Sequence, residues 1–323
     1  MGMTPVKWGI VSTAHINRLV IPPAQASEKC DLIAVASRDA ARAEAYAREW
    51  GIERSYGSYE ALLEDPDVEA VYISLPNSMH CEWSIRAVEA GKHVLCEKPM
   101  SSRAAEVEEA FDAAERAGRL LSEAFMWRHN PQTRKLTELV AGGAIGALRV
   151  IRTSFSFTIA DDPENVRLLS ALDGGALMDV GCYCVSASRL LGGEPLRAAG
   201  VQVDGGDGVD VLFAGAMLHD DGVTSHFDCG FVLPSRDELE VVGEEGSLFL
   251  DDPWHVHEPL IEIRRDGAVE RVEIERANSY LLELENLSEA IRGEAEPLLG
   301  RADAVGNARA IESLYAAAAA ATG

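Results

Sequence analysis

Basic residues are scarce in this sequence of 323 residues. It contains 29 lysines and arginines against 53 aspartates and glutamates, for a formal net charge of −24 at pH 7. So acidic a surface repels phosphate backbones and anionic lipids. The composition therefore predicts no nucleic-acid partner and no membrane partner.

Long apolar runs are also missing. The longest uncharged apolar stretch, 316–321, is far too short to span a bilayer. The N-terminal residues show neither the basic start nor the cleavable apolar segment of a signal peptide. We therefore expect a soluble, cytoplasmic protein.

The sequence lacks the spacings of a metal site. None of its six cysteines forms a Cys-x-x-Cys pair, and Cys182 and Cys184 have no second pair at zinc spacing. Reduced, packed thiols are the expectation. Four histidines also lack partners at metal spacing, so no metal is predicted; they are His219, His226, His255 and His257.

A regular alternation is present in the first 125 residues. Short apolar runs lie at 6–11, 30–37, 69–76, 92–99 and 119–125, with helical patterns between them. Three of these patterns end at a cap signal, Gly51, Gly91 or Gly118. The alternation predicts βαβ units and an α/β, doubly wound parallel sheet, with the carboxyl ends of the strands on the ligand-binding edge.

The pattern changes after residue 126. Several strands follow one another without helices between them, which predicts a largely antiparallel sheet. Two helices near 279–292 and 301–321 finish the chain. We predict a dinucleotide-binding Rossmann domain at 1–125 and a substrate-binding α+β domain at 126–323, whose last helices can pack back on the first domain.

The first strand-to-helix turn lacks the dinucleotide fingerprint Gly-x-Gly-x-x-Gly. Ser12, Ala14 and Asn17 occupy its three glycine positions. Ser12 and Ala14 are the next smallest choices, and the N–H groups of a helix start attract phosphate whatever its side chains. From this stretch alone, a plain strand-to-helix turn remains the alternative. The cofactor-binding candidates here are Ser12, Thr13, Ala14, His15 and Ile16.

The second strand ends in Ser37 and Arg38. A hydroxyl and a guanidinium suit a 2′-phosphate, so this turn favours NADP over NAD. Asp39 follows directly and keeps NAD possible, because an acidic residue near this strand end can hold ribose hydroxyls. A solvated turn is the alternative.

A third stretch, Glu97-Lys98-Pro99, ends another strand of the predicted parallel sheet. A lysine at that edge can lie beside a nicotinamide, with its ammonium directed at a substrate oxygen.

Three motifs in this order resemble the Gfo/Idh/MocA family, the glucose-fructose oxidoreductase-like enzymes. The family's Glu-Lys-Pro matches 97–99, its Pro-Asn-x-x-His matches 76–80, and its Gly-Gly-x-x-x-Asp-x-Gly-x-(His or Tyr) matches 174–183. The resemblance implies an open-faced second sheet that builds homodimers or homotetramers. It also implies cofactor contacts from Leu75, Pro76, Asn77, His80, Glu97 and Lys98.

One branch of that family is the most similar. The stretch 123–132 and Tyr183 in place of histidine resemble dihydrodiol dehydrogenases, NADP-dependent xylose dehydrogenases and glucose-fructose oxidoreductase. That branch tolerates loss of the first fingerprint glycine. Ser12 still differs from the glycine of the fingerprint, and this difference bears on the affinity for the cofactor.

The predicted chemistry is proton transfer coupled to hydride transfer. Asp179 and Tyr183 are four residues apart on a predicted helix and share a face. Tyr183 exchanges a proton with a carbinol oxygen, and the Lys98 ammonium stabilises both phenolate and alkoxide. Asp179 orients the substrate or Lys98. The structural alternatives are a half-buried tyrosine and a helix-start carboxylate.

The sequence indicates the substrate-binding residues less strongly than the residues above. Aromatic faces stack on sugar or arene rings and an arginine bonds hydroxyls, but each residue also fits plain core packing. They are Trp127, Arg128, Phe155 and Trp254, with Phe157 as a further possibility.

The sequence thus predicts an NAD(P)-dependent oxidoreductase, with NADP favoured, acting on a hydroxyl or carbonyl of a sugar, cyclic polyol or trans-dihydrodiol. Two alternatives stay open. A non-catalytic dinucleotide sensor has no use for Lys98 and Tyr183, and an NAD-dependent glycosidase fits poorly with the turn that favours NADP.

Overall fold

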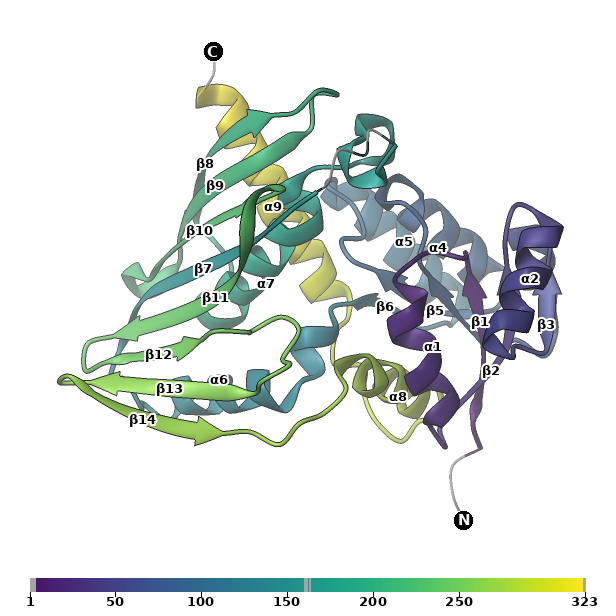
Figure 1. Ribbon diagram of the computed structural model, residues 1–323, viewed down its shortest axis with the longest axis horizontal. Helices are drawn as coiled ribbons and strands as arrows, with labels where there is room; N and C mark the ends of the chain where they lie inside the picture. The colour runs from purple at the N-terminus through teal and green to yellow at the C-terminus, as the bar shows by residue number, and fades with distance from the viewer. Residues whose placement is uncertain (1–3, 160–161, 163, 322–323) are drawn as a thin grey trace. The chain divides into compact units, whose positions relative to one another are not determined.

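The computed structural model describes residues 4–159, 162 and 164–321. The chain divides into two compact units, residues 1–126 with 278–305 and residues 127–277 with 306–323. Each unit contains one large sheet (Figure 1). Within the described ranges no helix is long and apolar enough to cross a membrane.

The first unit contains the predicted doubly wound sheet. Its six strands are all parallel and lie in the order β3-β2-β1-β4-β5-β6. The order reverses between β1 and β4, which is where such sheets open a crevice for ligands. The strands are β1 (Val6–Val11), β2 (Cys30–Ala36), β3 (Arg54–Tyr56), β4 (Ala70–Ile73), β5 (His93–Glu97) and β6 (Leu121–Ala124).

Helices connect these strands. They are α1 (Asn17–Ala26), α2 (Ala40–Trp50), α3 (Tyr59–Leu63), α4 (His80–Glu89) after the short turn η1 (Asn77–Met79), and α5 (Ala104–Ala117). The predicted caps are confirmed at α2 and α5, which end at Gly51 (φ +66°) and Gly118 (φ +63°). Strand β3 and helix α3 were not predicted because they have only 3 and 5 residues.

Helix α8 (Ser279–Ile291) completes the first unit from far along the chain. Its Leu284 and Leu287 join the apolar core around Trp8 and Tyr72, and Trp8 Nε1 donates a hydrogen bond to Ser288 Oγ at 3.1 Å. This burial of apolar surface fixes α8 against α1 and β2.

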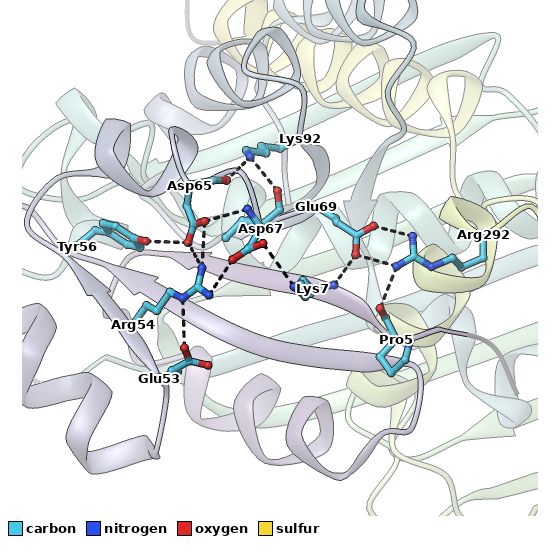
Figure 2. Close-up of polar contacts among 11 residues, drawn as sticks. Pro5, Lys7, Glu53, Arg54, Tyr56, Asp65, Asp67, Glu69, Lys92 and Arg292 are labelled. Atoms are coloured by element: carbon cyan, nitrogen blue, oxygen red, sulfur yellow. Dashed lines mark hydrogen bonds and ion pairs between the residues drawn. The ribbon is translucent and has the colours of Figure 1, made fainter.

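An ion-pair network links the amino ends of β1, β3 and β5 (Figure 2). Buried Asp65 accepts hydrogen bonds from Arg54 Nη1 at 2.8 Å and Tyr56 Oη at 2.7 Å, and Lys92 Nζ donates to the Asp65 carbonyl at 2.6 Å. Although burial raises the pKa of the Asp65 carboxyl, hydrogen bonds from Tyr56, the Asp67 N–H and Arg54 lower it below its ordinary value. The charged form is therefore the stable one, and the network supports the sheet end opposite the ligand edge.

The second unit holds the predicted mostly antiparallel sheet. Eight strands lie in the order β14-β13-β12-β11-β7-β10-β9-β8, and only β7 and β10 pair in parallel among those described. They are β7 (Leu148–Thr158), β8 (Arg197–Asp204), β9 (Asp210–Leu218), β10 (Thr224–Gly230), β11 (Val232–Gly243), β12 (Ser247–Leu250), β13 (Leu260–Arg265) and β14 (Ala268–Glu273).

The remaining elements of residues 126–321, apart from α8, are helical. They are η2 (Met126–His129), α6 (Pro131–Ala141), η3 (Val166–Leu168), η4 (Ser170–Leu172), the π-helical η5 (Leu177–Gly181), α7 (Cys182–Gly192), η6 (Asp220–Gly222) and α9 (Arg301–Ala321). Two details differ from expectation. The run 237–250, whose pattern predicts a single strand, forms most of the hairpin of β11 and β12, and β14 was missed because its residues are mostly exposed and polar.

Candidate functional site

The dinucleotide turn is built around Ser12, the residue that replaces the first fingerprint glycine. Its φ is +139°, in the region that glycine favours. Its Oγ lies 3.0 Å from the Ser74 carbonyl oxygen and 2.7 Å from Ser74 Oγ, and it accepts the Ala14 N–H at 3.0 Å. The serine side chain therefore fixes this turn to the residue that follows β4.

Asn17 closes the same network. Its Nδ2 donates to the Ser12 carbonyl at 3.0 Å, and Ser74 Oγ donates to its Oδ1 at 2.7 Å. Asn17 is buried and occupies the third fingerprint position, at the first residue of α1. The helix start carries no side-chain cap, since Ile16 has no polar atom to offer. An uncapped helix start next to a fixed turn suits a bound phosphate.

Ser12→Ala is expected to destabilise the protein by about 2 kcal/mol, because buried hydrogen-bonding groups lose their partner while the strained φ remains. Ser12→Gly loses the same bonds but relieves the strain, so it should be about 1 kcal/mol more stable than the alanine variant. Urea unfolding measures both. An alanine variant as stable as the glycine variant would show that Ser12 stores no strain.

The end of β2 presents polar groups to the same edge. Ser37 is buried, and Arg38 and Arg42 are exposed. Asp39 is the N-cap of α2, where its Oδ1 accepts the Arg42 N–H at 2.7 Å. One oxygen of the carboxylate that kept NAD possible thus caps a helix. Sequence reasoning missed Arg42, whose guanidinium lies 3.5 Å from the Thr13 carbonyl.

The residues after β4 are held by a buried histidine. His80 Nδ1 lies 2.8 Å from the Pro99 carbonyl oxygen and its Nε2 lies 2.7 Å from that of Leu75. His80 is only 1% exposed, whereas Pro76 and Asn77 are half-buried. Its ring therefore ties the turn after β4 to the turn after β5.

Lys98 lies in that second turn, at the carboxyl end of β5. Its backbone N–H donates to Glu97 Oε2 at 3.3 Å, and the Met100 N–H donates to the buried Glu123 Oε1 at 2.8 Å. The peptide bond between Lys98 and Pro99 is cis. The turn that carries Lys98 is therefore fixed on both sides by buried carboxylates.

A further buried acid lies behind Glu97. Tyr72 Oη donates to Glu97 Oε1. Glu283 of α8 is 1% exposed, and among the described residues its carboxylate oxygens have no hydrogen-bond partner. Burial, with the nearby Glu97 charge, raises the pKa of Glu283 well above its ordinary value.

Tyr183 stands at the start of α7 in the second unit, within an aromatic cluster. Its ring centroid is 5.4 Å from that of Phe155 and 5.7 Å from that of Trp254, and the Trp254 ring is 5.2 Å from Trp127. The structure thus brings Phe155 and Trp254 against Tyr183, and Trp127 against Trp254. Their rings are buried, which leaves little surface for stacking, and Phe157 packs on Phe231 instead.

Arg128 and Asp179 both have local partners. The Arg128 guanidinium is 5.8 Å from the Trp127 ring, and its Nη1 donates to Ser186 Oγ at 3.5 Å. Asp179 Oδ2 accepts from Arg167 Nε at 2.7 Å, a contact that the sequence did not suggest.

The predicted single helix that carries Asp179 and Tyr183 consists of two consecutive helical segments. Asp179 lies in the π-helical turn η5 and Tyr183 in the following α-helix, so the four-residue spacing does not place them as in a regular α-helix. Wider π turns are frequent at functional positions.

Close packing explains why the second residue of the Gly174-Gly175 pair has no side chain. Gly175 has φ +125°, and a Cβ there would lie 2.3 Å from Asp210 Oδ1 and 2.9 Å from Tyr315 Oη. Asp210 in turn accepts the Leu177 N–H at 2.7 Å. A side chain at 175 would thus displace the group that anchors the start of η5.

The four histidines differ in their surroundings. His219 lies against the Gly193 carbonyl and Ser225 Oγ, at 2.8 and 2.9 Å. His255 Nδ1 is 2.9 Å from Asp237 Oδ2, and potential ligand atoms of Asp237, Asp252 and His255 all lie within 4.8 Å of one another. Sequence spacing hid this group because Asp237 lies on β11, whereas Asp252 and His255 lie in the loop between β12 and β13.

Two family models match the chain. One, described as an oxidoreductase family with an NAD-binding Rossmann fold, covers residues 6–125, and the other, a GFO/IDH/MocA C-terminal domain, covers residues 133–249. Together they define an oxidoreductase of two parts, as the two sheets suggest. The chain belongs to the Gfo/Idh/MocA family, and the predicted resemblance is confirmed.

Relatives within the family act on sugars and diols. The chain is 40% identical to a D-xylose 1-dehydrogenase (NADP(+)) of Haloferax volcanii, over 96% of this chain and 97% of the relative. It is 36% identical to a trans-1,2-dihydrobenzene-1,2-diol dehydrogenase of Sus scrofa, over 77% and 75%. Both are named dehydrogenases, as predicted.

A solved structure has the same fold. The 3-ketoreductase KijD10 of Actinomadura kijaniata, in complex with NADP and TDP-benzene, matches with a TM-score of 0.90 and 29% identity over 97% of this chain and 98% of that chain.

Proposed function

We propose that this protein is an NADP-dependent oxidoreductase acting on a CH–OH or carbonyl carbon of a sugar, cyclic polyol or trans-dihydrodiol. The first domain would bind the dinucleotide and the second the substrate. The observation that carries the proposal is the turn of Lys98, which buried Glu97, Glu123 and His80 hold rigid at the ligand edge of the sheet.

Bound NADP would supply the hydride acceptor or donor at nicotinamide C4. The chain's own residues would move the proton, stabilise the developing charge and orient the substrate. The Tyr183 hydroxyl would exchange a proton with the carbinol oxygen, and the Lys98 ammonium would stabilise negative charge on both oxygens. The ion pair of Asp179 with Arg167 suits an orienting role for that carboxylate.

The NADP preference rests on the end of β2. Asp39 caps α2, while the Ser37 hydroxyl and the guanidinium groups of Arg38 and Arg42 are cationic or hydrogen-bonding groups suited to a 2′-phosphate. The NADP(+) in the name of the Haloferax relative and the NADP bound to KijD10 support the same choice.

Arg38→Ala is expected to weaken NADP binding by about tenfold to a hundredfold, because charge-assisted hydrogen bonds to the 2′-phosphate are lost. NAD binding should change little. Fluorescence titration with NADPH and NADH measures both. Arg48→Ala is the control, since Arg48 lies on α2, the helix that follows Arg38, and pairs with Glu44. Equal losses for both nucleotides would remove the 2′-phosphate assignment.

A substrate panel tests the reaction itself. Purified protein is mixed with NADP or NAD and with aldoses, cyclic polyols and trans-dihydrodiols, and reduced nicotinamide is followed by absorbance. Turnover with NADP supports the proposal. Tight NADPH binding without turnover in either direction would favour a sensor, and release of a glycosidic leaving group without net reduction would favour a glycosidase.

We also propose that the chain forms a homodimer or homotetramer through the second sheet. Val201 and Val203 of β8 are 60% and 54% exposed, which is unusual for valine on a strand of a large sheet. Light scattering tests this proposal, and a monomer at micromolar concentration would contradict it. A cytoplasmic location stays a prediction.

A further inference from the structure

The helix that carries Asp179 and Tyr183 begins without a cap of its own. It starts in η5 and continues directly into α7, and its N-cap residue Ala176 makes no side-chain hydrogen bond. The first N–H groups of a helix have no acceptor within the helix, so they need acceptors from elsewhere. The position of both candidate catalytic residues therefore depends on the group that receives these N–H groups.

An acceptor comes from the sheet. Asp210 is the first residue of β9 and is buried, and its Oδ2 accepts the Leu177 N–H at 2.7 Å. The dipole of the helix also favours a carboxylate at this end. Asp210 is thus a helix cap supplied by a residue that lies 33 positions further along the chain.

A tyrosine of the last helix holds the other oxygen of this carboxylate. Tyr315 Oη donates to Asp210 Oδ1 at 2.7 Å, and Tyr315 lies in α9, 105 positions further along the chain. The Tyr315 ring packs edge-on against Phe213 of β9, with ring centroids 5.8 Å apart. Both oxygens of Asp210 are therefore engaged, and the orientation of the carboxylate is fixed.

Gly175 brings the helix start against this pair. A Cβ at this position would come within 2.3 Å of Asp210 Oδ1 and 2.9 Å of Tyr315 Oη. The Gly175 carbonyl accepts the Asp179 N–H at 3.0 Å. The residue that packs on the Asp210 carboxylate thus also holds the backbone of Asp179.

The carboxylate is kept at this place at a cost in stability. Asp210 is 2% exposed, and burial raises the pKa of its carboxyl above the ordinary value, although hydrogen bonds from the Leu177 N–H and Tyr315 lower it. Apolar side chains could pack α9 on the sheet, because a buried charge is costly even when it is paired. A buried carboxylate at the start of this helix is therefore expected to serve the geometry of the site.

We propose that Asp210 is a positioning residue of the reaction, which acts through the helix start on Asp179 and Tyr183, and that Tyr315 fixes its orientation. The inference rests on the proposed function, because that function gives Asp179 and Tyr183 their roles. Asp210 itself touches neither substrate nor cofactor. It determines where the Asp179 carboxylate and the Tyr183 hydroxyl lie when hydride is transferred.

The experiment compares Asp210→Ala, Asp210→Asn and Tyr315→Phe with the wild type, on the substrate that the panel shows to be turned over fastest. Rates are expressed per NADPH-binding site, so that unfolded protein does not count. Asp210→Ala should lower kcat about tenfold to a hundredfold, because a misplacement of about 1 Å has effects of this size. The affinity for NADPH should hardly change. Asparagine keeps an acceptor for the Leu177 N–H, so Asp210→Asn should restore most of the turnover, and Tyr315→Phe should lie between the two.

Ser58 provides a control for the loss of a helix cap as such. Its Oγ accepts the Ala61 N–H at 3.1 Å at the start of α3 in the first unit, and it has no part in the proposed chemistry. Ser58→Ala should lower the thermal midpoint and leave kcat unchanged. A lower kcat in Asp210→Ala but not in Ser58→Ala would support positioning rather than a general loss of stability.

The kinetic outcomes separate this inference from the proposed function. Wild-type kcat in both Asp210→Ala and Tyr315→Phe would overturn the inference and leave the function standing. If Asp210→Ala does not fold, Tyr315→Phe decides. A lower kcat with unchanged NADPH affinity then supports the inference, and an unchanged kcat overturns it.

Hydrogen exchange tests the inference even if the wild type turns over no substrate, a result that would count against the proposed function alone. In Tyr315→Phe the N–H groups of residues 177–183 should exchange about fivefold faster, the effect of one lost hydrogen bond. The N–H groups of α2 should exchange as in the wild type. Mass spectrometry of peptides measures both, and unchanged exchange at 177–183 would overturn the inference.

Discussion

Lys98→Met is expected to give a folded protein that still binds NADPH and turns over at least about a hundredfold more slowly. Methionine keeps much of the length of lysine but lacks the ammonium that would stabilise the developing oxyanion. The turn itself should persist, because the backbone N–H of residue 98, which donates to Glu97 Oε2 at 3.3 Å, is unchanged by the substitution. Steady-state kinetics and NADPH titration measure the two effects separately.

The matched control for this variant is Lys135→Met. Lys135 is exposed on α6 and forms a surface pair with Glu138, which contributes little to stability. Its turnover should equal that of the wild type. Wild-type turnover in Lys98→Met would remove Lys98 from the chemistry, and loss of NADPH binding would instead assign it to cofactor binding.

Tyr183→Phe is expected to lower kcat by about a hundredfold to ten-thousandfold, the range for a lost general acid or base. The phenylalanine ring keeps the edge-on contact with Phe155 and the contact with Trp254. Turnover is measured in both reaction directions, because one proton is exchanged with the same oxygen in each.

Tyr59→Phe is the control for that variant. Tyr59 is a buried tyrosine of α3 that packs edge-on against Trp83 in the first unit. Its loss of a hydroxyl should leave kcat unchanged. If Tyr183→Phe retained full turnover while Lys98→Met lost it, the lysine alone would carry the proton transfer and the tyrosine would be a packing residue.

The two kinds of sheet could be predicted from the sequence with no structure. Continuous apolar runs such as 69–76 predict strands buried on both faces, and the observed β4 is buried at all four residues. The cap signals at Gly51 and Gly118 depend only on neighbouring residues, and both helices end there. Short elements such as β3 were missed because three residues carry no readable period.

The sequence also showed that Ser12 stands at the first glycine position of the fingerprint. It did not show which contacts the serine side chain makes. Ser74, the residue that receives the Ser12 side chain, is 62 positions away. The pairing of β1 with β4 brings them together. By contrast, the role of Asp39 as a helix cap was accessible locally, because an aspartate before a helical pattern is a cap signal.

The sequence by itself determined the fold class, the family and the order of the three motifs, because strand period, helix caps and motif spacing are local along the chain. Only the tertiary structure decided which side chains meet. Arg167 pairs with Asp179 across a turn, Asp237 of β11 meets His255 of the loop between β12 and β13, and Glu283 reaches the core near Glu97 from a helix far along the chain. Such contacts form because folding packs together segments that are far apart in the sequence. The local sequence pattern does not indicate which of these segments will meet.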